Sequence, residues 1–136
     1  MATTKFSDRR GRVGQAAEAA VSRGLGADGW QIVAQNVRWR EGEIDLIGID
    51  GSTLVFVEVK ALVAHDGVTP FSPFESIGAR KQRRIRALAR RWLVDDLPRL
   101  RDGRELTFST IRFDAFAVTL GLDDRVLAIE HLRDAF

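Results

Sequence analysis

The chain contains no cysteine among its 136 residues, and this absence excludes several kinds of chemistry at once. Disulfide bonds, zinc–thiolate centres and cysteine nucleophiles all require the missing thiol. The two histidines, His65 and His131, are far apart and lack the spacing of zinc ligands. No apolar run approaches the roughly 18 residues of a membrane span, and no hydrophobic stretch typical of a signal peptide follows the first residues. We therefore expect a cytoplasmic protein with no membrane partner.

The remaining composition is that of one folded domain. The chain is 45% hydrophobic and 29% charged, which supplies enough apolar material for a single core at this length. Residues 1–13 carry four bases, Lys5, Arg9, Arg10 and Arg12, against Asp8. We expect these residues to form a flexible basic arm and residues 14–136 to form the single domain.

The positive charge is concentrated in one segment, residues 80–93, RKQRRIRALARRWL. It holds seven bases and no acid, and it leaves 14 of the 21 bases against all 19 acids elsewhere, a net charge of −5. The bases are Arg80, Lys81, Arg83, Arg84, Arg86, Arg90 and Arg91. A mixed charge run is usually a solvated helix face, but an acid-free segment this dense favours contact with a polyanion. We expect these bases to bind nucleic acid.

Hydrophobic periodicity and turn signals predict a chain that alternates between helices and strands. Helices are expected over 14–28 and 80–93, the second ending at Asp95-Asp96-Leu97-Pro98, and strands over 30–37, 43–49, 54–60, 112–120 and 126–129. Residues 61–77, with one glycine and two prolines, form a long loop of the kind that often carries function. The order predicts an α/β fold in which helices flank a central mixed sheet.

Residues 42–60, GEIDLIGIDGSTLVFVEVK, place charged groups inside two apolar strands of a predicted hairpin. Side chains alternate along a strand, so Glu43 and Asp45 lie on the same face as each other, and so do Glu58 and Lys60. The turn decides whether the two pairs share one face. A two-residue turn at Asp50-Gly51 would set Glu43 opposite Glu58, and a four-residue loop would set Asp45 opposite Glu58. Either even-length turn gathers all four charges on one face, whereas a three-residue turn would separate the two pairs.

Three carboxylates on one face repel one another unless a cation lies between them. Carboxylate oxygens are ligands that Mg²⁺ prefers, so a divalent metal site is one interpretation. The alternative is a structural network in which Glu58 or Glu43 pairs with Lys60 or with a nearby arginine. The spacing alone leaves both open.

The charged hairpin also resembles a known nuclease signature. Asp45, twelve intervening residues and then Glu58-Val59-Lys60 resemble the D-(x)n-E-x-K motif of the PD-(D/E)-x-K nuclease superfamily. Together with RKQRR at 80–84, RFD at 112–114 and DAF at 134–136, GEIDLI and LVFVEVK resemble the YraN family, small bacterial proteins similar to archaeal-type Holliday junction resolvases. The resemblance covers residues 14–136 and implies a restriction-endonuclease-like fold. The family's Thr-Pro before the basic helix is Gly78-Ala79 here, so the usual hydroxyl cap is absent.

The resemblance implies roles for individual residues. Asp45, Glu58 and the Val59 carbonyl would hold Mg²⁺ or Mn²⁺, and Lys60 would orient water or stabilise charge in the transition state. The family's helix glutamate lies 25 residues before the one in GEIDLI, and Glu18 stands 25 before Glu43, so Glu18 would complete the metal shell. Glu43 is either an outer group of the site or the partner of an arginine. Gln82 either orients Lys60 or a phosphate, or is a solvated helical glutamine.

The implied function is a Mg²⁺-dependent endonuclease acting on DNA, in particular branched or structured DNA. The rivals are a nucleic-acid-binding module without turnover and an RNA nuclease. A homodimer follows from the resolvase analogy alone. Trp39, between Arg38 and Arg40, is the tryptophan that we expect to contact nucleic acid, whereas Trp30 and Trp92 are expected in the core. Asp114 is expected to bind backbone amides or an arginine.

Overall fold

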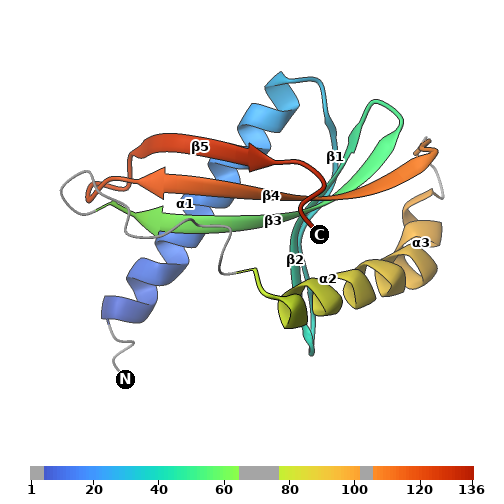
Figure 1. The fold of residues 1–136 in the computed structure, drawn as a ribbon, viewed down its shortest axis with the longest axis horizontal. Helices are drawn as coiled ribbons and strands as arrows, with labels where there is room; N and C mark the ends of the chain where they lie inside the picture. Colours follow the sequence, from blue (N-terminus) through green and yellow to red (C-terminus); the bar gives the residue numbers. More distant parts are fainter. Residues whose placement is uncertain (1–4, 65–76, 102–105) are drawn as a thin grey trace.

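The computed structural model describes residues 5–64, 77–101 and 106–136, and of residues 5–10 and 101 only the backbone. Two α-helices, α1 (Lys5–Ala27) and α2 (Ala79–Arg91), flank a five-stranded sheet (Figure 1). The strands are β1 (Gln31–Trp39), β2 (Gly42–Asp50), β3 (Thr53–Val63), β4 (Thr110–Leu120) and β5 (Val126–Leu132). This confirms the predicted α/β fold of the restriction-endonuclease-like kind.

The sheet is mixed and follows the chain in the order β1-β2-β3-β4-β5. Neighbouring strands are antiparallel except for β3 and β4, which are parallel and are connected through α2. In Figure 1, β1 and β2 run steeply across the view, whereas β3, β4 and β5 run nearly horizontally. The sheet is therefore strongly twisted between β2 and β3, as expected from the right-handed twist of strands.

The hairpin between β2 and β3 has the register that brings Asp45 opposite Glu58. Ile49 pairs with Leu54, which is one of the two expected registers, and Asp50 pairs with Thr53 to close a two-residue turn over Gly51-Ser52. Gly51 has a φ of 62°, in the left-handed region that glycine adopts without steric cost. Because the turn is of even length, the predicted alternation of β2 and β3 is retained.

The sheet buries a separate core on each face. On one face, α1 packs through Ala17, Val21 and Leu25 on side chains that include Leu46, Val55, Val57 and Val118. On the other face, Leu88 and Ala89 of α2 and the following Trp92 pack on side chains that include Ile47, Ile49, Leu54 and Phe56. The alternation of Leu54, Val55, Phe56 and Val57 between the two cores is the period-two pattern of a strand buried on both faces. Trp30 and Trp92 are buried in these cores as expected.

The helical segment after the basic residues continues beyond the predicted stop, and this expectation was wrong. A π-helical turn over Trp92–Asp96 leads directly into α3 (Leu97–Arg101), which includes Pro98. Proline has no amide hydrogen to donate to the carbonyl four residues earlier, but it is tolerated in the first turn of a helix. The wider turn, in which the Leu97 amide donates to the Trp92 carbonyl, lets the chain pass Pro98 without leaving the helical path.

Other boundaries differ from the expectations by a few residues. α1 begins at Lys5, and Val13, which was expected in the basic arm, is buried against the sheet. β3 continues to Val63 and β5 to Leu132, so the long loop begins later than predicted, and its residues 65–76 lie outside the described part of the chain. Within the described residues, none of the helices combines the length and apolar character needed to cross a membrane.

Candidate metal centre

Asp45 and Glu58 lie where β2 and β3 separate. The ladder between these strands ends at the pair Leu46–Val57, and Asp45 and Glu58 are the next residue on each strand. Both acids are buried, with exposed fractions of 5% and 7%. Past the end of the ladder, the Val59 amide donates to Asp45 Oδ2 at 2.7 Å. The side chain of Asp45 thus takes the place of a strand partner and is fixed between β2 and β3.

Glu18 reaches the same place from the middle of α1. Carboxylate oxygens of Glu18, Glu43 and Asp45 all lie within 4.8 Å of one another. The Glu18 carboxylate also accepts a hydrogen bond from the side chain of Asn36. Asn36 lies across from Asp45, between the pairs Gln35–Leu46 and Val37–Ile44, and has a φ of 51°. Glu43 is more exposed, and Arg38 Nε donates to its Oε2 at 3.1 Å. The expected arginine partner of Glu43 is therefore present.

Burial and mutual repulsion shift the pKa of these acids upward. Burial is the largest cause that raises the pKa of Asp45 to about 8, and the neighbouring charge of Glu58 is the next. Burial also raises the pKa of Glu18, and the charge of Glu43 adds to it, against hydrogen bonds from Asn36 and Asp45 that lower it. The raised pKa favours the protonated form of the Asp45 carboxyl, and a hydrogen bond from this carboxyl to Glu18 is one of the causes that lower the pKa of Glu18. The group is an acidic cluster whose full ionisation the surrounding protein opposes.

Glu58 is held by a lysine of α2. Lys81 Nζ lies 2.5 Å from Glu58 Oε1. Lys60, two residues after Glu58 on β3, lies in the same space, and its pKa is lowered by burial and by the charge of Lys81, against the attraction of Glu58 and Asp45. One amine, that of Lys81, therefore contacts the Glu58 carboxylate, and a second, that of Lys60, lies near enough for its charge to interact with it. Glu58 is nevertheless close enough to Asp45 for its charge to contribute more to the raised pKa of Asp45 than the charges of Glu18 and Glu43.

The donor set fits a hard divalent cation. Mg²⁺ and Mn²⁺ bind to carboxylate and carbonyl oxygens. Glu18, Glu43 and Asp45 supply carboxylate oxygens within a small volume, and the charge of Glu58 acts on Asp45 from the neighbouring strand. The pKa of Asp45 is raised first by burial and then by the neighbouring carboxylates, and a dication bound there would favour the ionised carboxylate. The chain has no thiol, and among the described residues no imidazole joins the cluster, so these donors do not resemble a zinc centre. The residues present therefore fit the group that the motif implies.

The seven bases of residues 80–93 do not form a uniform surface. Arg80, Arg83, Arg84, Arg86 and Arg90 are exposed on α2. Arg86 covers the ring of Phe113, with its guanidinium carbon 4.7 Å from the centroid. Arg91 Nη1 donates to Glu41 Oε2 at 3.0 Å, so an acid at the β1–β2 turn already engages this arginine. Lys81 is paired with Glu58. The arginines of the first two turns are thus the most available for phosphate.

Gln82 stabilises the start of α2. Its side-chain amide donates to the Ile77 carbonyl at 3.0 Å, and its backbone amide donates to the Gly78 carbonyl. Gly78, at the cap position, supplies no side-chain hydrogen bond, as expected from the missing hydroxyl. Gln82 therefore connects the helix to the chain that precedes it.

Trp39 lies beside the acidic cluster. It is half-buried and lines a shallow depression of about 340 Å³ together with Arg38, Arg40, Glu41, Gly42 and Glu43. An aromatic ring between two arginines is a typical stacking position for a nucleobase. The depression is continuous with Glu43, so a chain bound there would lie next to the cluster.

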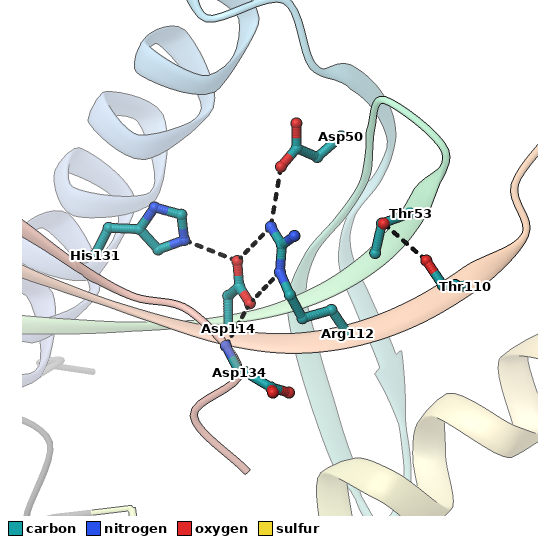
Figure 2. Close-up of polar contacts among 7 residues, drawn as sticks. All are labelled: Asp50, Thr53, Thr110, Arg112, Asp114, His131 and Asp134. Carbon is teal, nitrogen blue, oxygen red and sulfur yellow. Dashed lines mark hydrogen bonds and ion pairs between the residues drawn. The ribbon is translucent and has the colours of Figure 1, made fainter.

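Asp114 has the structural role expected of it. The Arg112 guanidinium donates to both carboxylate oxygens at 2.8 and 3.0 Å, and the Asp134 amide donates to Oδ1 at 3.0 Å (Figure 2). Arg112 also donates to Asp50 Oδ2 at 3.1 Å. Burial would raise the pKa of Asp114, but the hydrogen bonds from Arg112, Asp134 and His131 outweigh it and lower the pKa. This network fixes the β2–β3 turn to β4 and to the C-terminal residues.

Sequence reasoning missed three partners in these sites. His131, for which the sequence suggested no role, contacts Asp114 Oδ2 through Nε2 at 2.7 Å and stacks on Phe116. Asn36 was treated only as part of a strand, and Lys81 only as a phosphate-binding base. Each contact joins residues of two successive elements and depends on how those elements pack in three dimensions, so no local pattern could have revealed it. The one local signal was the presence of an asparagine within a predicted strand, since asparagine is depleted in strands and tolerates positive φ.

Comparison with known proteins agrees with the sequence motifs. The model of the uncharacterised protein family UPF0102 matches residues 17–118. A UPF0102 protein of Rhodococcus jostii is 43% identical over 91% of this chain and 95% of its own length. Similar proteins occur in Symbiobacterium thermophilum, at 44% identity over 85% of this chain and 88% of the relative, and in Moorella thermoacetica, at 36% over 94% and 95%. The matched region contains Glu18, Asp45, Glu58, Lys60 and the basic helix.

Proposed function

Because the chain belongs to the uncharacterised protein family UPF0102, its activity has to be argued from its own site, and we propose a Mg²⁺-dependent endonuclease acting on DNA. The observation that carries the proposal is Asp45. It is a buried carboxyl group with three acidic neighbours and a pKa raised to about 8. Without a bound cation, the burial of Asp45 among other acids would lower the free energy of unfolding, and no interaction would compensate for it.

Asp45, Glu58, the Val59 carbonyl and Glu18 would hold the metal ion. Bound there, Mg²⁺ or Mn²⁺ would polarise a phosphoryl oxygen and lower the pKa of a coordinated water. Lys60 can orient the attacking water or stabilise negative charge in the transition state. Its lowered pKa favours proton exchange closer to neutral pH than an ordinary lysine allows.

The exposed arginines of α2 supply affinity for the phosphate backbone. Such contacts position a nucleic acid without reading its sequence, so shape would decide which substrate is cut. Together with the resemblance to resolvases, this supports branched or otherwise structured DNA as the substrate. Trp39 would add a stacking contact beside the cluster.

A second candidate, a nucleic-acid-binding module without turnover, is supported by the ion pair between Lys81 and Glu58. This pair neutralises one of the expected metal ligands within the protein itself. The buried Asp45, which has no ion pair with a base among the described residues, favours the enzyme, because binding of phosphates by α2 does not require a buried carboxyl group. An RNA nuclease would use the same residues and differs only in its substrate.

A cleavage assay separates these candidates. The substrates are duplex, single-stranded and four-way-junction DNA and RNA, each with Mg²⁺, with Mn²⁺ and with EDTA. We expect metal-dependent cleavage of DNA that is lost in both Asp45→Asn and Lys60→Ala and retained in Glu130→Gln, which alters an exposed acid of β5. Binding without cleavage by the parent protein, unchanged by both substitutions, would establish the binding module instead. Cleavage confined to RNA would establish the third candidate.

A further inference from the structure

Lys81 and Glu58 connect the two parts of the candidate site. Lys81 is the third residue of α2, so it belongs to the basic surface, whereas Glu58 belongs to the acidic centre on β3. Their side chains differ in exposure, 35% for Lys81 and 8% for Glu58. The ion pair therefore has one buried end and one end that reaches the solvent-facing side of α2.

The pair leaves Glu58 unable to serve as a metal ligand without a rearrangement. The Glu58 oxygen that Lys81 contacts is already neutralised, and Lys60 places a second ammonium group in the same space. A dication beside Glu58 would be repelled by both amines. Lys60 extends from β3 itself, two residues from Glu58, whereas Lys81 comes from a separate element. Departure of Lys81 is thus the smaller rearrangement.

The side chain of Lys81 can move from Glu58 to the exposed basic surface of α2. Exposed Arg80, Arg83 and Arg84 are its neighbours on α2, and a lysine has a flexible four-carbon stem. When the Lys81 ammonium group leaves Glu58, it joins this surface. There a phosphate of the nucleic acid would replace the Glu58 carboxylate as its partner. Without a phosphate, the departing lysine would lose a charged partner, so binding of the cation and of the nucleic acid favour each other.

We propose that Lys81 holds Glu58 while no cation is bound and moves to a phosphate of the nucleic acid when the cation takes Glu58. This rests on the proposed metal-dependent function and adds a coupling to it. Lys81 acts as a positioning residue that competes with the cation for one carboxylate. Its presence makes the centre bind metal weakly until a substrate arrives.

Calorimetric titration of the full-length protein with Mn²⁺ alone tests whether Lys81 competes with the cation for Glu58. Lys81→Met removes the competing charge, and we expect Mn²⁺ to bind about tenfold more tightly than to the parent protein. Arg83→Met, which removes an exposed base of the same helix, should leave the affinity unchanged. In a Glu58→Gln background, Lys81→Met should have no effect. Lys81→Gln, whose amide can still hydrogen-bond to Glu58, serves if Lys81→Met does not fold, and should also tighten binding.

Equal or weaker Mn²⁺ binding by the Lys81 variants would overturn the inference, and the proposed function would stand as long as the parent protein binds the ion. If the parent protein and the variants all fail to bind Mn²⁺, the metal site itself is wrong, and the coupling falls with it. Binding of an uncleavable phosphorothioate junction gives the second readout. Lys81→Met should weaken it in Mn²⁺ and leave it unchanged in EDTA; equal weakening in both would make Lys81 an ordinary phosphate contact.

Discussion

The buried carboxyl of Asp45 affects the stability of the protein as well as its proposed chemistry. Its pKa is about 8 in the folded state and near 4 in an unfolded chain, so the folded state retains a proton that the unfolded state releases. Between these values the free energy of unfolding falls as the pH rises. This is the reverse of the usual behaviour of an aspartate in an ion pair.

Asp45→Asn should therefore stabilise the metal-free protein and abolish its response to metal. Asparagine is neutral at every pH, so the gain should grow from pH 5 to pH 8 and reach about 1–3 kcal/mol at pH 8. Urea unfolding in EDTA measures this gain in the free energy of unfolding. When the unfolding is repeated with Mg²⁺, the ion should stabilise the parent protein but not the variant. A variant that is less stable than the parent at pH 8 would contradict the raised pKa.

Asp114 has a pKa shift opposite to that of Asp45, so its effect on stability changes with pH in the opposite direction. Its pKa is lowered, so its contribution to stability is present above the ordinary pKa of an aspartate and is lost as the pH falls through the lower, folded value. Asp114→Asn leaves Arg112 without its carboxylate in a buried network and should cost about 2–4 kcal/mol. Affinity for Mn²⁺ should stay within about twofold of the parent, since the network lies outside the acidic cluster. A large loss of Mn²⁺ binding with little loss of stability would contradict this assignment.

Among the elements, the strands were the most predictable. β2 and β3 alternate between two cores with few exceptions, and the register needed only an even-length turn. The predicted boundaries of these strands agree with the structure within a residue or a few. The acidic face of the hairpin could therefore be located from the sequence, because side-chain direction in a strand follows position alone.

The helices were less predictable for physical reasons. Pro98 is a stop signal when it follows a helix and a start signal when it opens one, and the local sequence does not distinguish these cases. The contacts of Asn36, Lys81 and His131 depend on how α1, α2 and β5 approach the sheet. Such contacts follow from the three-dimensional packing of one element on another and not from a pattern within either element. The sequence therefore predicted which acids gather but not which base holds one of them.

Gly48 shows how closely β1 packs on β2. A methyl group on it would lie 3.0 Å from Trp30 Cε3 and 3.2 Å from the Gln31 carbonyl oxygen. Gly48→Ala should therefore destabilise the protein by about 1–3 kcal/mol in chemical denaturation. Gly24→Ala is the matched control, because α1 leaves open space around that position and alanine favours helix by up to about 1 kcal/mol. Equal effects of the two substitutions would show that the contact between Trp30 and Gly48 is not close.

For the molecule as a whole, the separation of charge is the dominant feature. The acidic cluster lies between α1 and the β2–β3 strands, and the exposed arginines lie on α2 next to it. A net charge of +2 therefore conceals an acidic body with one basic surface. Such a surface attracts a polyanion and directs it toward the acidic centre only if cations neutralise that centre.

The salt dependence of DNA binding should report this surface. Arg83→Ala should lower the slope of log affinity against log salt by about 1, the change expected for one lost phosphate contact. Arg91→Ala should change it less, because Glu41 already engages Arg91. Fluorescence anisotropy at several salt concentrations measures both slopes. If Arg91 contributes more than Arg83, the nucleic acid lies along the other end of α2.

The presence of a cation among Asp45, Glu58 and Glu18 is the claim on which the rest depends. Anomalous diffraction from crystals soaked in Mn²⁺ tests it most directly. We expect one peak bounded by the Asp45 and Glu58 carboxylates, with Lys81 no longer on Glu58, and no peak in Asp45→Asn crystals. A map without a peak near Asp45 at saturating Mn²⁺, with Lys81 still bound to Glu58, would contradict the account.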